Sequence, residues 1–92
     1  MIPGAVSVRV TGRVQGVSFR AWTEAEARRL GLAGWVRNAP DGSVEARLQG
    51  DPEAVRQMLR RLWDGPSAAH VTGVDSSPTA TEPGLSGFEI RR

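Results

Sequence analysis

Residues 6–20 read Val6-Ser7-Val8-Arg9-Val10-Thr11-Gly12-Arg13-Val14-Gln15-Gly16-Val17-Ser18-Phe19-Arg20. In the first part of this stretch valines alternate with polar residues, which is the pattern of a half-buried strand. Two glycines, Gly12 and Gly16, follow, and apolar residues recur at helical spacing from Phe19 onward. The stretch therefore predicts a strand, a glycine-containing loop and a helix in direct succession.

The predicted loop has the features of an anion-binding site. Glycine has no Cβ, so backbone N–H groups beside it can approach an anion closely. The N-terminus of the following helix adds unpaired N–H groups and a dipole that attracts negative charge. Arg20 adds a planar guanidinium whose donors match phosphate oxygens, although a solvated arginine on a surface helix is the alternative interpretation. The predicted phosphate-binding loop comprises Gln15, Gly16, Val17, Ser18, Phe19 and Arg20.

Strand and helix patterns alternate along the rest of the chain. The turn Ala39-Pro40-Asp41-Gly42 joins two strands, and Asp51-Pro52-Glu53 starts a second helix that Gly65-Pro66 ends. Residues 76–84 are expected to form a surface loop. The strands are expected at residues 6–10, 33–38, 43–49, 71–74 and 88–91, and the first helix at residues 19–30. This order predicts an α+β sandwich, βαββαβ, in which an antiparallel sheet of four to five strands carries two helices on one face.

Length and composition restrict the class of protein. Ninety-two residues are expected to form a single domain, residues 1–92. No apolar run approaches the roughly 20 residues that a membrane-spanning helix needs. The absence of cysteine and the single histidine argue against disulfides and a structural zinc site. The N-terminal residues have neither the basic nor the apolar region of a signal peptide, so a cytoplasmic location is expected.

The high isoelectric point, about 11.0, is a weak indication of a nucleic-acid partner. All basic residues are arginines and the formal net charge is only +2. Because the chain has no lysine, tyrosine or cysteine, almost nothing titrates between the carboxylates and the guanidiniums. An RNA-binding domain would also need aromatic residues on an open sheet face, and the chain has only three tryptophans and two phenylalanines. We expect an anionic small molecule instead of a nucleic acid.

Asn38 is a second candidate site residue, at the end of a predicted strand and directly before the turn. Its side chain carries one acceptor oxygen and two donor hydrogens, so it can hold a water molecule in one orientation. An asparagine before a turn more often bonds to its own backbone. From the residues alone, this second interpretation is favoured.

Together, these segments resemble the acylphosphatase family. The first motif of that family, G-x-V-Q-G-V-x-F-R, matches residues 12–20 at every specified position. The second motif has glycines, an aromatic residue, an asparagine and a valine, found here as Gly34, Trp35, Asn38, Gly42, Val44 and Gly50. The resemblance spans roughly residues 6–90, and two long motifs at the right separation are far more specific than one glycine-rich loop. It implies a ferredoxin-like α/β sandwich.

The resemblance also implies an activity, the hydrolysis of small acyl phosphates to a carboxylate and inorganic phosphate. By this likeness Arg20 and Asn38 are the catalytic residues: Arg20 binds the phosphate with backbone amides of residues 15–19, and Asn38 positions the attacking water. No metal or organic cofactor is implied, and we expect a monomer without nucleic-acid or membrane partners. The alternative function is a non-catalytic module that binds phosphate or carbamoyl phosphate.

Overall fold

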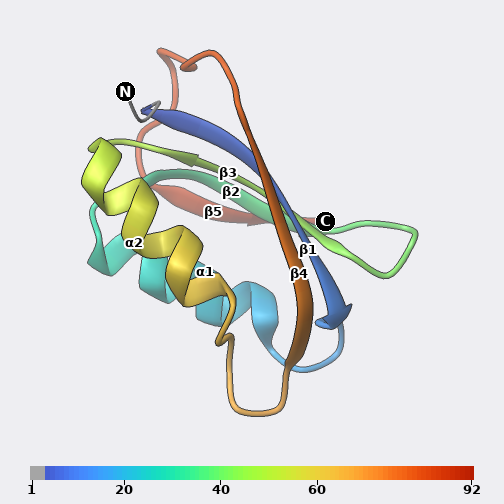
Figure 1. The fold of residues 1–92 in the computed structure, drawn as a ribbon. Coiled ribbons are helices and arrows are strands. Elements are labelled where there is room, and N and C mark those ends of the chain that lie inside the picture. Colours follow the sequence, from blue (N-terminus) through green and yellow to red (C-terminus); the bar gives the residue numbers. More distant parts are fainter. Residues whose placement is uncertain (1–3) are drawn as a thin grey trace.

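The computed structural model describes residues 4–92. Within this range the chain forms seven elements, in the order β1 (Ala5–Arg13), α1 (Phe19–Arg29), β2 (Ala33–Asn38), β3 (Val44–Gln49), α2 (Pro52–Leu62), β4 (His70–Pro78) and β5 (Phe88–Arg91). The strands form one sheet in the order β4-β1-β3-β2-β5. Figure 1 shows both helices on the same face of this sheet. The predicted α+β sandwich with two helices on one face is therefore confirmed. Neither helix is long and apolar enough to cross a membrane.

The sheet is mixed, and the expectation of a wholly antiparallel sheet is wrong for its last strand. β5 runs parallel to β2, with Ile90 opposite Val36, whereas all other pairs are antiparallel. β4 ends with Pro78 opposite Val6, at the end of the sheet where β1 and β2 begin. The connection after β4 crosses that same end (Figure 1). β5 therefore starts there and must run in the same direction as β2.

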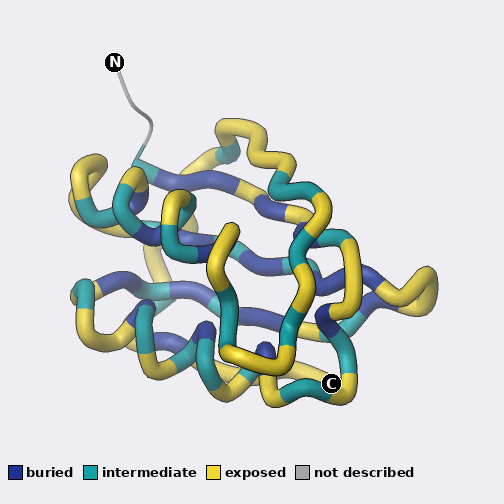
Figure 2. The backbone as a smooth tube through the Cα atoms, turned by 60° about the horizontal axis from the view of Figure 1, so that its bottom comes forward, coloured by how far each residue is buried: buried dark blue, intermediate teal, exposed yellow. Residues whose placement is uncertain are grey.

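β4 is longer than its sequence pattern predicts. The apolar pattern indicates residues 71–74, but the strand spans His70–Pro78, so the first part of the predicted loop 76–84 belongs to the sheet. β1, which is also longer than expected, pairs with β4 along most of its length and holds the polar residues of β4 extended. No residue of β4 is buried (Figure 2), so an apolar alternation could not reveal its extent. Pro78 lies at the end of an edge strand, where a missing N–H is tolerated.

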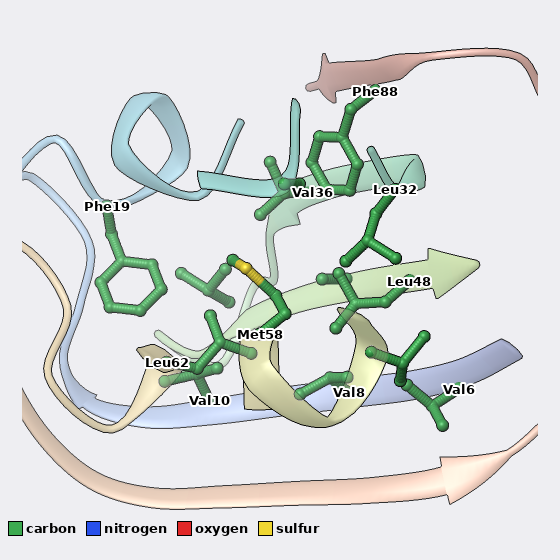
Figure 3. Packing of buried hydrophobic residues seen from close by; sticks show 14 of the residues in the cluster. Val6, Val8, Val10, Phe19, Leu32, Val36, Leu48, Met58, Leu62 and Phe88 are labelled. Atoms are coloured by element: carbon green, nitrogen blue, oxygen red, sulfur yellow. The ribbon is translucent and has the colours of Figure 1, made fainter. Parts of the chain in front are cut away.

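The core lies between the helices and the sheet. Met58 of α2 lies in the middle of the cluster, Phe19 lies at one end near Leu62, and Phe88 lies beside Val36 (Figure 3). Burying a side chain of this size contributes about 1.5–3 kcal/mol to folding. Because Phe19 is the first residue of α1 and is only 1% exposed, it fixes the start of the helix and the loop before it.

Candidate active site

The loop between β1 and α1 leads into a helix that has no side-chain cap. Ser18 occupies the N-cap position in the left-handed region, with φ 63°, and its side chain makes no capping hydrogen bond. The first turn of α1 has no acidic residue. In α2, by contrast, the side chain of Asp51 accepts a capping hydrogen bond from the backbone N–H of Glu53. Glu53 also places a negative charge in the first turn of α2. The N-terminus of α1 therefore keeps its amides and its partial positive charge for an external anion.

The two glycines of the opening stretch have different roles. Gly12 belongs to β1, and a Cβ at this position would lie 2.1 Å from the carbonyl oxygen of His70. It therefore permits the close approach of β4. Gly16 lies in the loop with φ 75°, and nothing lies within 4 Å of the position that a Cβ would occupy. Of these two glycines, only Gly16 lies in the predicted phosphate-binding loop.

Gly16, Ser18 and Arg20 line one hollow of about 600 Å³. Its remaining lining consists of Ala21, Ile90 and Arg92. The structure thus brings three of the predicted loop residues together and adds a wall from the C-terminal strand that the sequence motifs did not indicate.

Arg20 differs from most arginines of the chain in having no acidic partner. No carboxylate of residues 4–92 lies within ion-pair distance of its guanidinium, whereas most other arginines pair with aspartate or glutamate, such as Arg9 with Asp41 at 2.6 Å. A guanidinium at an uncapped helix N-terminus without a counter-charge is suited to bind a dianion.

Asn38 ends β2 on the face of the sheet that carries the helices. It follows the buried Val36 by two positions, and side chains two apart share a face. Its Oδ1 atom is buried and accepts no hydrogen bond from any residue within 4–92, so the alternative bond to the turn is not formed. Buried acceptors without a partner are rare in proteins, so this oxygen is an unusual feature of the strand end. Asn38 does not line the hollow at Arg20.

Gln15 connects the loop to the turn that follows Asn38. Its Nε2 donates hydrogen bonds to the carbonyl oxygens of Ala39 and Ser43, both at 2.8 Å. The backbone N–H of Ala39 also donates to the Ser43 carbonyl at 2.8 Å, which closes the turn. The side-chain amide of Gln15 is thus committed to the turn, and only its backbone can face a phosphate. One side chain joins the two predicted halves of the site.

Asp41 holds the same turn from within. The backbone N–H and the hydroxyl of Ser43 donate to Asp41 Oδ1 at 2.9 and 2.6 Å. Arg9 donates to Asp41 Oδ2 and to the hydroxyl of Ser43. The hydrogen bonds from Ser43, together with the positive charge of Arg9, lower the pKa of Asp41 below its ordinary value. The turn after Asn38 is therefore fixed by two independent sets of contacts.

The other predicted loop residues offer backbone groups only. The side chain of Phe19 is buried in the core, and Val17 packs against the same cluster.

Among residues 4–92 there is no group of three or more histidine, aspartate or glutamate side chains arranged to hold a metal ion.

Comparisons with known proteins indicate the family of this chain. A family model described as Acylphosphatase matches residues 6–90. An acylphosphatase of Nocardioides sp. is 56% identical over 87 residues, which is 95% of this chain and 87% of the relative. An acylphosphatase structure from Coxiella burnetii superposes with a TM-score of 0.91 at 36% identity, over 95% of this chain and 90% of that one. The acylphosphatase of Bacillus subtilis gives the same TM-score at 33% identity, over 96% and 98% of the two chains.

Proposed function

This chain belongs to the acylphosphatase family, and we propose that it hydrolyses small acyl phosphates with the loop of residues 15–19, Arg20 and Asn38. Its curated relatives are acylphosphatases over almost the whole chain, so the protein is an enzyme of this class and its substrate is a small acyl phosphate. The observation that carries the assignment of residues is the unpaired Arg20 beside the uncapped N-terminus of α1.

In the proposed complex the phosphoryl group lies at the N-terminus of α1. The loop amides donate hydrogen bonds to its oxygens, and the guanidinium of Arg20 neutralises part of their charge. Phosphoryl transfer depends mainly on positioning and on stabilising charge at the three equatorial oxygens. An acyl phosphate already has a good leaving group, a carboxylate, so a site with few polar side chains is sufficient.

Asn38 supplies the water-binding half of the proposed site. Its side-chain amide holds the attacking water by a hydrogen bond and orients it toward phosphorus. The Gln15 side chain holds the turn after Asn38 against the loop that binds the phosphate, so the distance between water and phosphorus is set by two hydrogen bonds of 2.8 Å. Precise placement of reacting groups is a major source of catalysis in such reactions.

In the proposed reaction no protein side chain accepts the proton of the attacking water, because the substrate itself does so. The water oxygen forms a bond to phosphorus, and the bond between phosphorus and the acyl oxygen breaks, with its electron pair leaving on the carboxylate. A phosphate oxygen of the substrate accepts the proton of the water. The pH–rate profile should therefore follow ionisation of the substrate; a limb that disappears when one protein carboxylate is replaced would contradict this route.

The decisive experiment compares Arg20→Ala with Arg56→Ala, an arginine of α2 that pairs with Glu53 on the surface. Removing one donor that stabilises transition-state charge typically costs about 100- to 1000-fold in turnover. We therefore expect Arg20→Ala to lose benzoyl phosphate hydrolysis by at least that order and to bind inorganic phosphate more weakly as an inhibitor. Arg56→Ala should retain full activity. If Arg20→Ala is folded and turns over within a few-fold of the unaltered protein, the assignment is wrong.

Turnover in the same assay also separates the enzyme from the alternative, a module that binds phosphate or carbamoyl phosphate without hydrolysis. The proposal includes a monomer as its oligomeric state. It also includes a cytoplasmic location. Small domains in oxidising compartments are often stabilised by disulfides, and this chain has no cysteine.

A further inference from the structure

Ile90 is a large apolar side chain that remains exposed beside the proposed phosphate site. It lies on β5 opposite the buried Val36, on the face of the sheet that carries the helices. Phe88 precedes it by two positions on the same face and is 3% exposed, whereas Ile90 is 38% exposed. The alternation of β5 thus directs Ile90 toward the core side of the sheet, but the fold does not cover it.

The direction of α1 explains this exposure. Arg28, in the last turn of α1, donates to the carbonyl oxygen of Phe88 at 3.0 Å, so the C-terminal end of the helix covers the start of β5. The first turn of α1 lies at the other end of β5, where Ala21 and Ile90 line the same hollow. Ile90 therefore lies next to the uncapped N-terminus of α1 and beside Arg20.

The hollow has both polar and apolar lining residues. Gly16, Ser18, Arg20 and Arg92 provide donors and positive charge, while Ala21 and Ile90 provide hydrocarbon. Its volume of about 600 Å³ is that of a site for a small organic molecule and exceeds the needs of a phosphate alone. In an acyl phosphate only one oxygen separates phosphorus from the acyl carbon, so an acyl group must begin close to these walls.

We propose that Ile90 contacts the acyl group and determines specificity, so that the enzyme prefers acyl phosphates with a branched aliphatic or aromatic acyl part. This inference rests on the proposed function and adds the substrate class to it. An apolar acyl group removes the exposed part of Ile90 from water, whereas the methyl group of acetyl phosphate is too short to do so. Burial of apolar surface is the energetic basis of this preference.

The test measures kcat and KM for benzoyl phosphate and acetyl phosphate with the unaltered protein, Ile90→Ala, Ile90→Leu and Arg92→Gln. For Ile90→Ala we expect KM for benzoyl phosphate to rise about three- to tenfold, the effect of losing a few partly buried methyl or methylene groups. Its kcat for benzoyl phosphate should stay within about twofold of the value for the unaltered protein. The same holds for its kcat and KM with acetyl phosphate. Ile90→Leu should restore the benzoyl preference. Arg92→Gln removes a charge from the same wall, so it should leave that preference unchanged.

Two results would overturn the inference. One is an Ile90→Ala variant in which both substrates are affected equally or not at all. The other is a benzoyl preference that depends on Arg92 instead of Ile90. Failure of the proposed function would appear differently, because the unaltered protein would then hydrolyse neither substrate. Thermal unfolding of each variant shows whether a change in KM reflects a local contact or loss of structure.

Discussion

Replacing Gln15 by alanine should slow hydrolysis by loosening the contact between the phosphate-binding loop and the turn after Asn38. The variant loses two hydrogen bonds, each worth about 0.5–1.5 kcal/mol net, so the free energy of unfolding should fall by about 1–3 kcal/mol. Both carbonyl oxygens keep a backbone partner: Ala39 O accepts from Gly42 N–H, and Ser43 O accepts from Ala39 N–H. No buried acceptor is left without a bond, and the protein should remain folded.

Gln49→Ala is a matched control. Gln49 also makes two hydrogen bonds, both to the backbone of Glu82, at 3.0 and 2.8 Å. It lies at the opposite end of the sheet, where β3 pairs with the start of β1 and β2. Denaturant unfolding should show similar losses of stability in the two variants, about 1–3 kcal/mol, and only Gln15→Ala should lose activity.

The kinetic signature distinguishes positioning from simple destabilisation. A displacement of about 1 Å can reduce a rate by up to about 100-fold, so kcat of Gln15→Ala with benzoyl phosphate should fall by about tenfold or more. Inhibition by inorganic phosphate should change less, because Arg20 and the loop amides remain. An unchanged kcat, or a loss equal to that of Gln49→Ala, would show that the link between loop and turn has no catalytic role.

Three further outcomes follow from the site. Asn38→Ala should lower kcat by about tenfold or more while phosphate inhibition is unchanged; equal loss of both would indicate a structural role in the turn. Because the pKa of Asp41 is lowered in the folded protein, its carboxylate stabilises the fold fully above the pKa of an unfolded aspartate, and the effect is lost as pH falls through the folded pKa. Unfolding curves of Asp41→Asn and the unaltered protein should thus differ at neutral pH and converge in acid; a pH-independent difference would refute the assigned cause. Gly16→Ala should cost about 1–2 kcal/mol from its left-handed backbone, whereas Gly12→Ala should cost clearly more in thermal unfolding, since its Cβ would meet a backbone carbonyl.

Structural features that depend on residues close together in the sequence were predicted well. The starts of both helices, at Phe19 and Pro52, follow from the change of hydrophobic period and from the Asp-Pro start of α2. The turn after Asn38 follows from its proline and Asp-Gly pair. These features arise from φ preferences and short-range hydrogen bonds, which act over a few residues and can therefore be inferred without knowledge of the tertiary structure.

Features that depend on partners far along the chain were not predictable. The full length of β4 is imposed by pairing with β1, because its residues after Val74 have no apolar alternation and no residue of the strand is buried. The role of Gln15 depends on carbonyl groups 24 and 28 positions away. The alternation of β5 indicates which face Ile90 occupies but not whether a helix covers that face. The sequence shows which donors, acceptors and apolar groups a residue has, but its long-range contacts depend on the tertiary structure.

The parallel direction of β5 is the feature that completes the site. β1 and β2 both pair antiparallel with β3, so their C-terminal ends lie at the same end of the sheet. That end carries the loop after β1 and the turn after Asn38, which explains how Gln15 can reach across. Because β5 runs parallel to β2, its C-terminal end, with Ile90, lies there too. An antiparallel β5 would have placed Ile90 toward the opposite end, and the hollow would have lacked this apolar side chain. The strand direction that the sequence could not indicate therefore determines where an acyl group can lie.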